Sequence, residues 1–189
     1  MPAGTELTAE QLKRIVEYDP ETGCFRWRDT FEAGICCARM QKPYPKPGDI
    51  VRAVRKNALY QYMSIDGKWY LTHRLVWLYV YGKFPARGLH IDHINHDGFD
   101  NRLCNLRLAT RSQNYFNKKT SGRNTSGYRG VSWHSQIKRW RAAVWANGKR
   151  IESSTFVDAE AAARWRDLMA KKLHGEFAVL NFPEAGGSN

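Results

Sequence analysis

The sequence predicts an α+β protein in two parts. Short segments of alternating apolar residues, separated by turn-forming Gly, Asn and Asp, indicate antiparallel strands. Each group of such segments is followed by a stretch with apolar residues at helical spacing. The polar, Gly-containing run KKTSGRNTS separates the two groups. We therefore expect a first domain at 1–117, a linker at 118–126, a second domain at 127–182 and a tail at 183–189.

The basic excess of the chain lies in one stretch. The 189 residues include 30 Lys and Arg against 18 Asp and Glu, a net charge of +12. No acidic residue occurs from Asn101 to Ile151, where twelve basic residues account for the whole excess. A local field of this kind favours a polyanionic partner. Nucleic acid is favoured over a membrane, because no apolar run approaches 18 residues.

The N-terminal segment predicts a helix followed by a strand. The sequence Thr8-Ala9-Glu10-Gln11 is typical of a capping box and precedes apolar residues at helical spacing, so we expect a helix to about Tyr18. Residues 19–23 form a predicted turn and Cys24–Trp27 a strand. The segment 31–48, with three prolines, is expected to be an irregular loop.

Three further strands and a helix are predicted next. Ile50–Val54, Leu59–Ile65 and Lys68–Leu71 have strand composition, and Asp66-Gly67 is a hairpin signal between the last two. A strongly apolar helix is expected from about Thr72 to Tyr81, because Gly82 follows it.

The stretch from His90 to Asn117 holds the candidate catalytic chemistry. Asp92 and His93 are adjacent in a short apolar frame, Asn105 follows His93 by twelve positions, and Asn114 follows Asn105 by nine. Phosphodiester hydrolysis needs a base for water and a hard divalent cation for the developing charge. A carboxylate and an amide oxygen are ligands that Mg²⁺ accepts.

The local pattern predicts two strands and a helix around these residues. Residues 90–94 alternate and are β-branched, His96-Asp97-Gly98 is turn chemistry, and 105–109 alternate again. Thr110 is a plausible helix N-cap ahead of Asn114.

This order of residues resembles the signature of phage-type HNH homing endonucleases, the ββα-metal nucleases. The resemblance implies that Asp92 and Asn114 bind one Mg²⁺ ion, with Mn²⁺ as the other candidate, and that His93 is the base. It also implies that Asn105 orients the His93 imidazole through its backbone or side-chain carbonyl. The preceding sheet and helix, with His73 near the helix start, resemble the support region of these enzymes. We interpret His73 as a residue that makes a structural hydrogen bond near the core.

Other polar residues have weaker claims to a role. His90 and His96 match no ligand position of the family, so we interpret them as neighbours of solvent or phosphate. The four cysteines show no paired C-x-x-C spacing, which disfavours structural zinc. Because the sequence shows no secretory signal, we expect the cysteines to be reduced thiols. We expect the protein to lie in the cytoplasm of a bacterial host and to be encoded by a phage or by that host. A metal or redox role for Cys36-Cys37 has little support.

The C-terminal part predicts a three-stranded sheet and one helix. Strands are expected at Tyr128–His134, Arg139–Ala146 and Lys149–Phe156, and Asn147-Gly148 is the strongest hairpin signal of the chain. Asp158 is the predicted helix cap, followed by apolar residues at helical spacing: Ala162, Trp165, Leu168, Met169 and Leu173. One face of the sheet should rest on this helix.

The order of YRGV, KRWRAAV, NGKR, STF and HGEFAVLNF resembles the Apetala-two type DNA-binding domain of plant ethylene-response factors. The resemblance implies a sheet in the major groove of double-stranded DNA. Alternation places Arg139 and Arg141 on one face and Trp140 opposite, as a core candidate. The chain departs from the plant pattern at Ser153-Ser154, which usually is Leu-Gly. The implied DNA contacts are Arg129, Trp133, Arg139, Arg141, Trp145 and Arg150.

These observations together predict an HNH endonuclease that cuts duplex DNA and gains site preference from its C-terminal reader. We expect Arg111, on the catalytic helix, to contact phosphate. The expected state is a monomer without a membrane or protein partner. Two alternatives stay open: a DNA-binding regulator with a non-catalytic nuclease half, and an HNH restriction or repair nuclease. A simpler interpretation than DNA contact is also open for both residue types. The Trp residues could pack in the core, and the Arg residues could form a solvated basic face.

Overall fold

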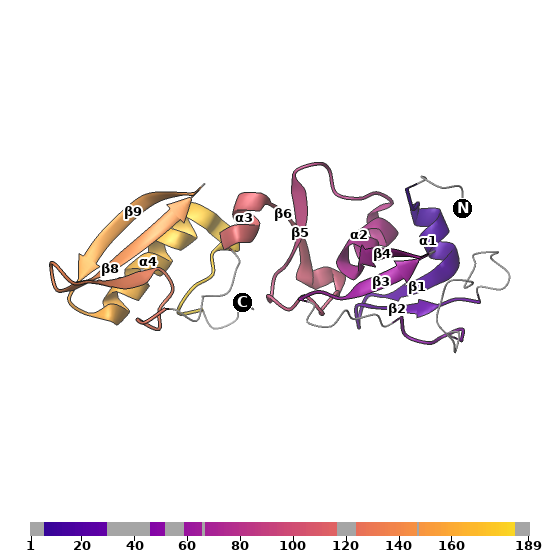
Figure 1. Cartoon of the computed structure of the whole chain (residues 1–189), viewed down its shortest axis with the longest axis horizontal. Coiled ribbons are helices and arrows are strands. Elements are labelled where there is room, and N and C mark those ends of the chain that lie inside the picture. The colour runs from indigo at the N-terminus through magenta and orange to yellow at the C-terminus, as the bar shows by residue number, and fades with distance from the viewer. Residues whose placement is uncertain are drawn as a thin grey trace. The chain divides into compact units, whose positions relative to one another are not determined.

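The computed structural model describes residues 6–29, 46–51, 59–65, 67–116, 124–146 and 148–183. They form an α+β protein with small antiparallel sheets and few helices, which confirms the expected class (Figure 1). The chain divides into two compact units. The first comprises Met1–His93 and Asp97–Leu108, and the second comprises Ile94–His96 and Ala109–Asn189.

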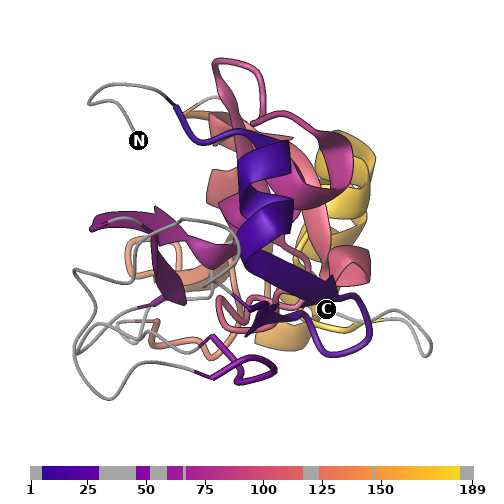
Figure 2. The same ribbon diagram turned by 90° about the vertical axis from the view of Figure 1, so that its right-hand side faces the viewer.

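The first unit begins with helix α1 (Ala9–Ile15), which the Thr8–Gln11 capping box starts as predicted. The prediction that this helix continues to Tyr18 is wrong. Val16–Asp19 is strand β1, which pairs antiparallel with β2 (Cys24–Trp27), and Figure 2 shows α1 leading directly into β1. Val16 is β-branched and fully buried opposite Trp27, so pairing with β2 outweighs the local helical pattern.

A hairpin and a helix follow in the first unit. Strands β3 (Tyr62–Ile65) and β4 (Lys68–Leu71) pair antiparallel, and α2 (Thr72–Tyr81) has the predicted bounds. Gly82 ends α2 in the left-handed conformation, with φ of 75°, as the sequence indicated. Of the expected loop at 31–48 and strand at 50–54, the residues 31–45 and 52–54 lie outside the described part of the chain.

The candidate catalytic segment forms two paired strands, as expected. β5 (Leu89–His93) pairs with β6 (Leu106–Thr110), and a 3₁₀ turn, η2 (Leu103–Asn105), precedes β6. Helix α3 (Arg111–Phe116) follows directly. The backbone N–H of Gln113 donates to Thr110 Oγ1 at 3.3 Å, and the backbone N–H of Thr110 donates to Gln113 Oε1 at 2.8 Å. This reciprocal pair confirms Thr110 as the cap of α3.

One hydrophobic core holds the first unit together. It draws buried side chains from α1, β1, β2, β3, α2, β5 and β6, among them Leu12, Phe25, Met63, Leu75 and Ile91. Tyr18, Phe25 and Tyr79 contact one another by their rings within it. Ile91 on β5 is part of this core. The core therefore anchors the strand that carries Asp92 and His93.

The second unit contains a three-stranded antiparallel sheet in the order β7-β8-β9. Its strands are β7 (Val131–His134), β8 (Arg139–Ala146) and β9 (Lys149–Phe156), and the last two have the predicted bounds. Helix α4 (Ala159–His174) packs against all three, and Asp158 caps it through a 2.7 Å bond from Ala161 N. A short 3₁₀ turn, η3 (Gly175–Phe177), follows.

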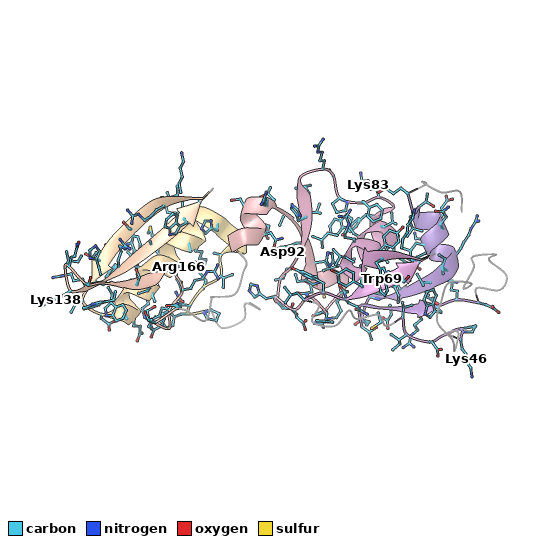
Figure 3. All side chains as sticks on the ribbon, viewed as in Figure 1. Lys46, Trp69, Lys83, Asp92, Lys138 and Arg166 are labelled. Carbon is cyan, nitrogen blue, oxygen red and sulfur yellow. The ribbon has the colours of Figure 1, made fainter. Side chains whose placement is uncertain are left out.

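The buried face of α4 differs from the predicted one. Leu168 and Leu173 were expected on the apolar face but are exposed, at 62% and 37%, whereas Arg166 and Asp167 are buried. The Asp167 carboxylate accepts hydrogen bonds from Asn181 N, Asn181 Nδ2 and Phe182 N, and Arg166 donates to Val179 O. Figure 3 labels Arg166, a buried residue of α4. The polar contacts with residues 179–182 therefore set the rotation of α4.

None of the helices in the described part of the chain is long and apolar enough to span a membrane.

Candidate active site

Strand β5 carries Asp92, which Figure 3 labels, and its neighbour His93. Both side chains are buried, each residue being 5% exposed. Consecutive strand residues point to opposite faces, so the two side chains meet different surroundings. Burying two polar side chains is costly unless each has partners. Both have them, and the partners differ in charge.

The Asp92 carboxylate pairs with Arg107. Arg107 Nε lies 3.0 Å from Asp92 Oδ2, and the two side chains are 14% and 5% exposed. Arg107 lies on β6, the strand that pairs with β5. Sequence reasoning counted Arg107 only as part of the basic run and missed this contact. The pairing of two adjacent strands, once predicted, was the signal that could have found it.

The His93 imidazole contacts Asn101. His93 Nε2 lies 3.3 Å from Asn101 Oδ1. Burial lowers the pKa of His93, and the hydrogen bond with Asn101 and the charge of Asp92 offset part of this shift. A lowered pKa keeps the ring neutral near pH 7, which is the state that can accept a proton.

Two aromatic rings line His93. Tyr60 stacks on it at 5.8 Å between ring centroids, and His73 meets it edge-on at 5.0 Å. His73 is buried as predicted, although within the described part of the chain its Nδ1 has no hydrogen-bond partner. Burial lowers the pKa of His73 to about 3, with the neighbouring His93 as a further cause. His73 is therefore a neutral ring that packs against His93.

Asn105 and Asn114 occupy different units. Asn105, in η2, is buried, and its Nδ2 donates to Asp100 O at 2.8 Å. Asp92, His93 and Asn105 thus belong to the first unit, and Asn114 lies half-buried on α3 in the second. Of the remaining histidines in this region, His90 is exposed and His96 has a positive φ of 62°.

The described residues contain no group of three His, Cys, Asp or Glu side chains that could enclose a metal ion. The expected donor set is smaller, since it consists of one carboxylate and one amide oxygen. Cys24 and Cys104 are free thiols, and Cys36-Cys37 lies outside the described residues.

The sheet of the second unit separates the expected DNA contacts by face. Trp140 packs on the helix side against the core cluster, as predicted. Arg139 and Arg141, by alternation, point to the other face. Trp145 follows on that same face and pairs with Arg150 across the strands, next to a β-bulge. All four side chains are exposed or half-buried.

Trp133 does not share this face. It pairs directly with Trp140, and their rings lie 5.1 Å apart, so both point to the side of α4. Trp133 is still 49% exposed because β7 is an edge strand. The backbone of Arg129 is fixed by Asn181, whose side chain bonds both Arg129 N and Arg129 O. Arg111 is exposed on α3.

Comparisons with known proteins find an endonuclease family model and viral relatives. A family model described as HNH endonuclease matches residues 70–115. Protein 3.8 of Escherichia phage T7 is 39% identical over 106 residues, which are 56% of this chain and 86% of that protein. An uncharacterized HNH endonuclease of Acanthamoeba polyphaga mimivirus is 41% identical over 110 residues, 58% of this chain and 56% of that protein.

The C-terminal region has relatives of another kind. An AP2-like ethylene-responsive transcription factor of Arabidopsis thaliana is 36% identical over 74 residues, which are 34% of this chain and 17% of that protein. No solved structure matches. The chain thus spans little more than half of the mimivirus relative and under a fifth of the plant factor.

The chain belongs to the HNH endonuclease family, and its C-terminal region is related to the AP2-like transcription factors. The resemblance to HNH endonucleases and the resemblance of the C-terminal region to AP2-like factors are therefore confirmed.

Proposed function

We propose that this protein is a metal-dependent endonuclease of the homing or mobile-element type that hydrolyses phosphodiester bonds in duplex DNA. The observation that carries the proposal is the buried Asp92–His93 pair on β5, with Arg107 beside the carboxylate and Asn101 beside the imidazole. Polar side chains are buried side by side in this way at a cost that a purely structural strand would avoid.

His93 is the base in this proposal. Its neutral imidazole takes a proton from a water molecule, the water oxygen forms a bond to phosphorus, and the bond from phosphorus to the 3′ oxygen breaks. The 3′ oxygen takes up a proton, so the products carry a 5′-phosphate and a 3′-hydroxyl. Asn105 is proposed to orient the His93 imidazole through its backbone or side-chain carbonyl, while its Nδ2 donates to Asp100 O.

The donor set suits one Mg²⁺ or Mn²⁺ ion. Asp92 offers a buried carboxylate, which the ion would have to share with the cationic guanidinium of Arg107. Asp92 and the amide oxygen of Asn114 would hold the ion, and water and substrate oxygens would complete its shell. When bound, the ion would stabilise negative charge on the scissile phosphate and the leaving oxygen.

The second unit is proposed to supply site preference. The open sheet face presents Arg139, Arg141, Trp145 and Arg150, a set that can contact bases, sugars and phosphates. Arg129 and Arg111 are further candidates, and Trp133 would reach DNA only from the sheet edge. A tethered reader raises the effective DNA concentration at the nuclease, so a weakly specific nuclease gains affinity and preference.

Plasmid nicking tests the proposal. His93→Ala should reduce cleavage by about 100-fold or more, because a positioned base contributes on the order of 10²–10⁴-fold. Asp92→Ala should stop turnover or raise the Mg²⁺ or Mn²⁺ concentration needed for half-maximal cutting. DNA binding, followed by gel shift in the absence of a divalent ion, should change little in either variant.

His90→Ala is the matched control, because His90 is exposed on the same strand and outside the proposed set. Normal cleavage by the His93→Ala protein would refute the base assignment, and an unchanged metal titration in Asp92→Ala would refute the ligand assignment. A wild-type protein that binds DNA but never cuts it, at any divalent ion concentration, would instead favour the DNA-binding regulator.

A further inference from the structure

Three large apolar side chains are exposed close to His93 in the first unit. Leu59 is 79% exposed, Tyr60 39% and Phe99 43%. We call these three residues the apolar edge. Single exposed apolar residues are common on protein surfaces, but a group of them beside a candidate site indicates a surface that another molecule covers.

Gly98 is the point at which the two segments that carry the apolar edge meet. A Cβ at Gly98 would lie 2.1 Å from Leu59 O and 2.7 Å from Tyr60 Cδ1, and the backbone N–H of Gln61 donates to Gly98 O at 3.4 Å. Only glycine permits so close an approach. Phe99 follows Gly98 directly, so all three side chains start from one contact between the segments.

The apolar edge adjoins the proposed base. The Tyr60 ring stacks on His93 with 5.8 Å between ring centroids, and it meets His73 edge-on at 5.5 Å. In the proposed function the scissile phosphate lies within reach of His93. The sugar and base next to that phosphate would therefore come close to Tyr60.

The backbone of Phe99 is fixed although its side chain is exposed. Its N–H donates to Asp97 Oδ1 at 2.9 Å, and its carbonyl oxygen accepts a hydrogen bond from Asn101 Nδ2 at 3.2 Å. The backbone N–H of Asp100 donates to Asp97 O at 3.1 Å, which closes the turn around Phe99. A side chain on a backbone held in this way loses little conformational freedom when it binds a partner.

The charges around Phe99 disfavour a phosphate at the same place. The run from Asp97 to Asn101 contains two acidic residues and no Lys or Arg. Arg102 follows this run, but it donates to both oxygens of the Asp100 carboxylate, at 2.8 Å and 2.7 Å. The uncharged sugar and base are therefore the part of the DNA that suits the apolar edge.

We propose that Leu59, Tyr60 and Phe99 bind the sugar and base next to the scissile phosphate of duplex DNA by apolar contact and ring packing. The proposal rests on the proposed function, in which His93 acts on that phosphate, and it assigns a surface to the neighbouring nucleoside. Packing of aromatic side chains on bases tolerates different sequences, because every base has a π face. The apolar edge therefore adds affinity at the cut site without adding sequence preference.

Gel shift without a divalent ion, at several salt concentrations, tests the contact. Tyr60→Ala and Phe99→Ala should each weaken binding to duplex DNA by about 5-fold or more, the usual loss when one stacking side chain is removed. The slope of log K against log salt should keep its wild-type value, because these side chains displace no counterions. Tyr60→Phe keeps the ring and removes the hydroxyl, so it should bind like wild type.

Tyr81→Ala is the matched control. Tyr81 is an exposed aromatic residue of the same unit, 50% exposed, at the end of α2 opposite to His73. It should bind DNA like wild type at every salt concentration.

Photochemical crosslinking locates the contact on the DNA. Sequencing the ends of the plasmid products maps the cut, and a duplex with 5-bromodeoxyuridine next to that position is then irradiated with the protein in the absence of a divalent ion. The crosslinked peptide, identified by mass spectrometry, should contain Tyr60 or Phe99.

Four results would overturn the proposal. They are wild-type affinity in folded Tyr60→Ala and Phe99→Ala, a reduced salt slope in these variants, an equal loss of affinity in Tyr60→Phe and Tyr60→Ala, and crosslinks confined to other residues. Failure of the proposed function has a different sign. The wild-type protein would then leave the plasmid intact, whereas failure of this proposal alone leaves wild-type cleavage normal.

Discussion

His73 lies against His93 in the first unit as a buried, neutral ring. Its Nδ1 is buried and without a hydrogen-bond partner within the described part of the chain, and its edge faces His93 at 5.0 Å between centroids. Protonation of His73 would place a positive charge in the core, close to His93 and to the charge of Arg74. The folded state therefore resists protonation at this position, and stability becomes coupled to pH.

This coupling predicts loss of stability in acid. The pKa of His73 falls from its ordinary value of 6.5 to about 3 on folding, so between these values only the unfolded chain binds the proton. The stabilising contribution is complete above pH 6.5 and is lost as pH falls toward 3, by at most about 1.4 kcal/mol per pH unit. Urea unfolding of wild type and His73→Phe at pH 7, 6, 5 and 4 would measure it. Phe keeps an aromatic ring without a proton site, so its stability should fall less steeply. Parallel curves for the two proteins would contradict the assignment.

The sequence pointed to candidate residues for the site but not to their contacts. Asp92, His93 and Asn105 stand at a spacing that two strands and a turn explain. Arg107 and Asn101 became visible only when the strands were paired and the loop between them was folded. A hydrogen bond such as that of Asn101 with Gln61, forty positions away, leaves no local pattern in the chain.

At the scale of elements, the turn between β1 and β2 is built around Gly23. Its φ of 70° is one that residues with a Cβ rarely adopt, and the turn touches the backbone of the loop that holds Asn101. Two costs therefore add at this position, one from the backbone conformation and one from the close approach.

A matched pair of substitutions separates these costs. Gly82 also has a positive φ, 75°, but a Cβ there would meet nothing within 4 Å. Gly82→Ala should cost about 1–2 kcal/mol, the price of the left-handed conformation alone. Gly23→Ala should cost clearly more, because backbone atoms at 2.4 Å and 2.6 Å must move. It should also lower cleavage, since the displaced peptide carries Asn101. Urea titration and plasmid nicking measure the two effects, and equal losses of stability for both variants would argue against the close packing.

Strands and caps were predicted well where the signal is local. The bounds of α2, β8 and β9 and the caps at Thr8, Thr110 and Asp158 follow from turn residues and side-chain chemistry close in sequence. Tertiary pairing was needed for the rest. Val16–Asp19 joined β2 instead of extending α1, and the buried face of α4 was chosen by polar contacts with residues 179–182.

At the scale of the whole molecule, the basic residues outnumber the acidic ones by twelve, and the acid-free stretch runs from the nuclease motif into the second unit. Counterions released from DNA phosphates should make binding depend strongly on salt. Within this basic stretch, the open face of the β7-β8-β9 sheet is the surface that we propose contacts DNA.

Salt dependence can test that face. The double variant Arg139→Ala, Arg141→Ala should bind duplex DNA more weakly and reduce the slope of log K against log salt by about 1 for each lost phosphate contact. Lys172→Ala is the control, since Lys172 is exposed on α4, which covers the opposite face. It removes a positive charge without touching the sheet. Fluorescence anisotropy at salt concentrations from about 50 to about 200 mM would measure this difference in slope. Equal slopes for the two variants would contradict the proposed interface.

The hydrogen bonds between residues 179–182 and α4 also determine where a fragment of the second unit can end. Asp167 accepts three hydrogen bonds from Asn181 and Phe182, and Asn181 in turn holds the backbone of Arg129 just ahead of β7. A fragment that stopped at the end of α4 would keep all three strands of the sheet and α4 itself. The buried carboxylate of Asp167 would nevertheless lose its partners at residues 181 and 182 and keep only the ion pair with Arg166. A fragment made to study the second unit should therefore extend to Phe182, because hydrogen bonds beyond the last regular element satisfy its interior.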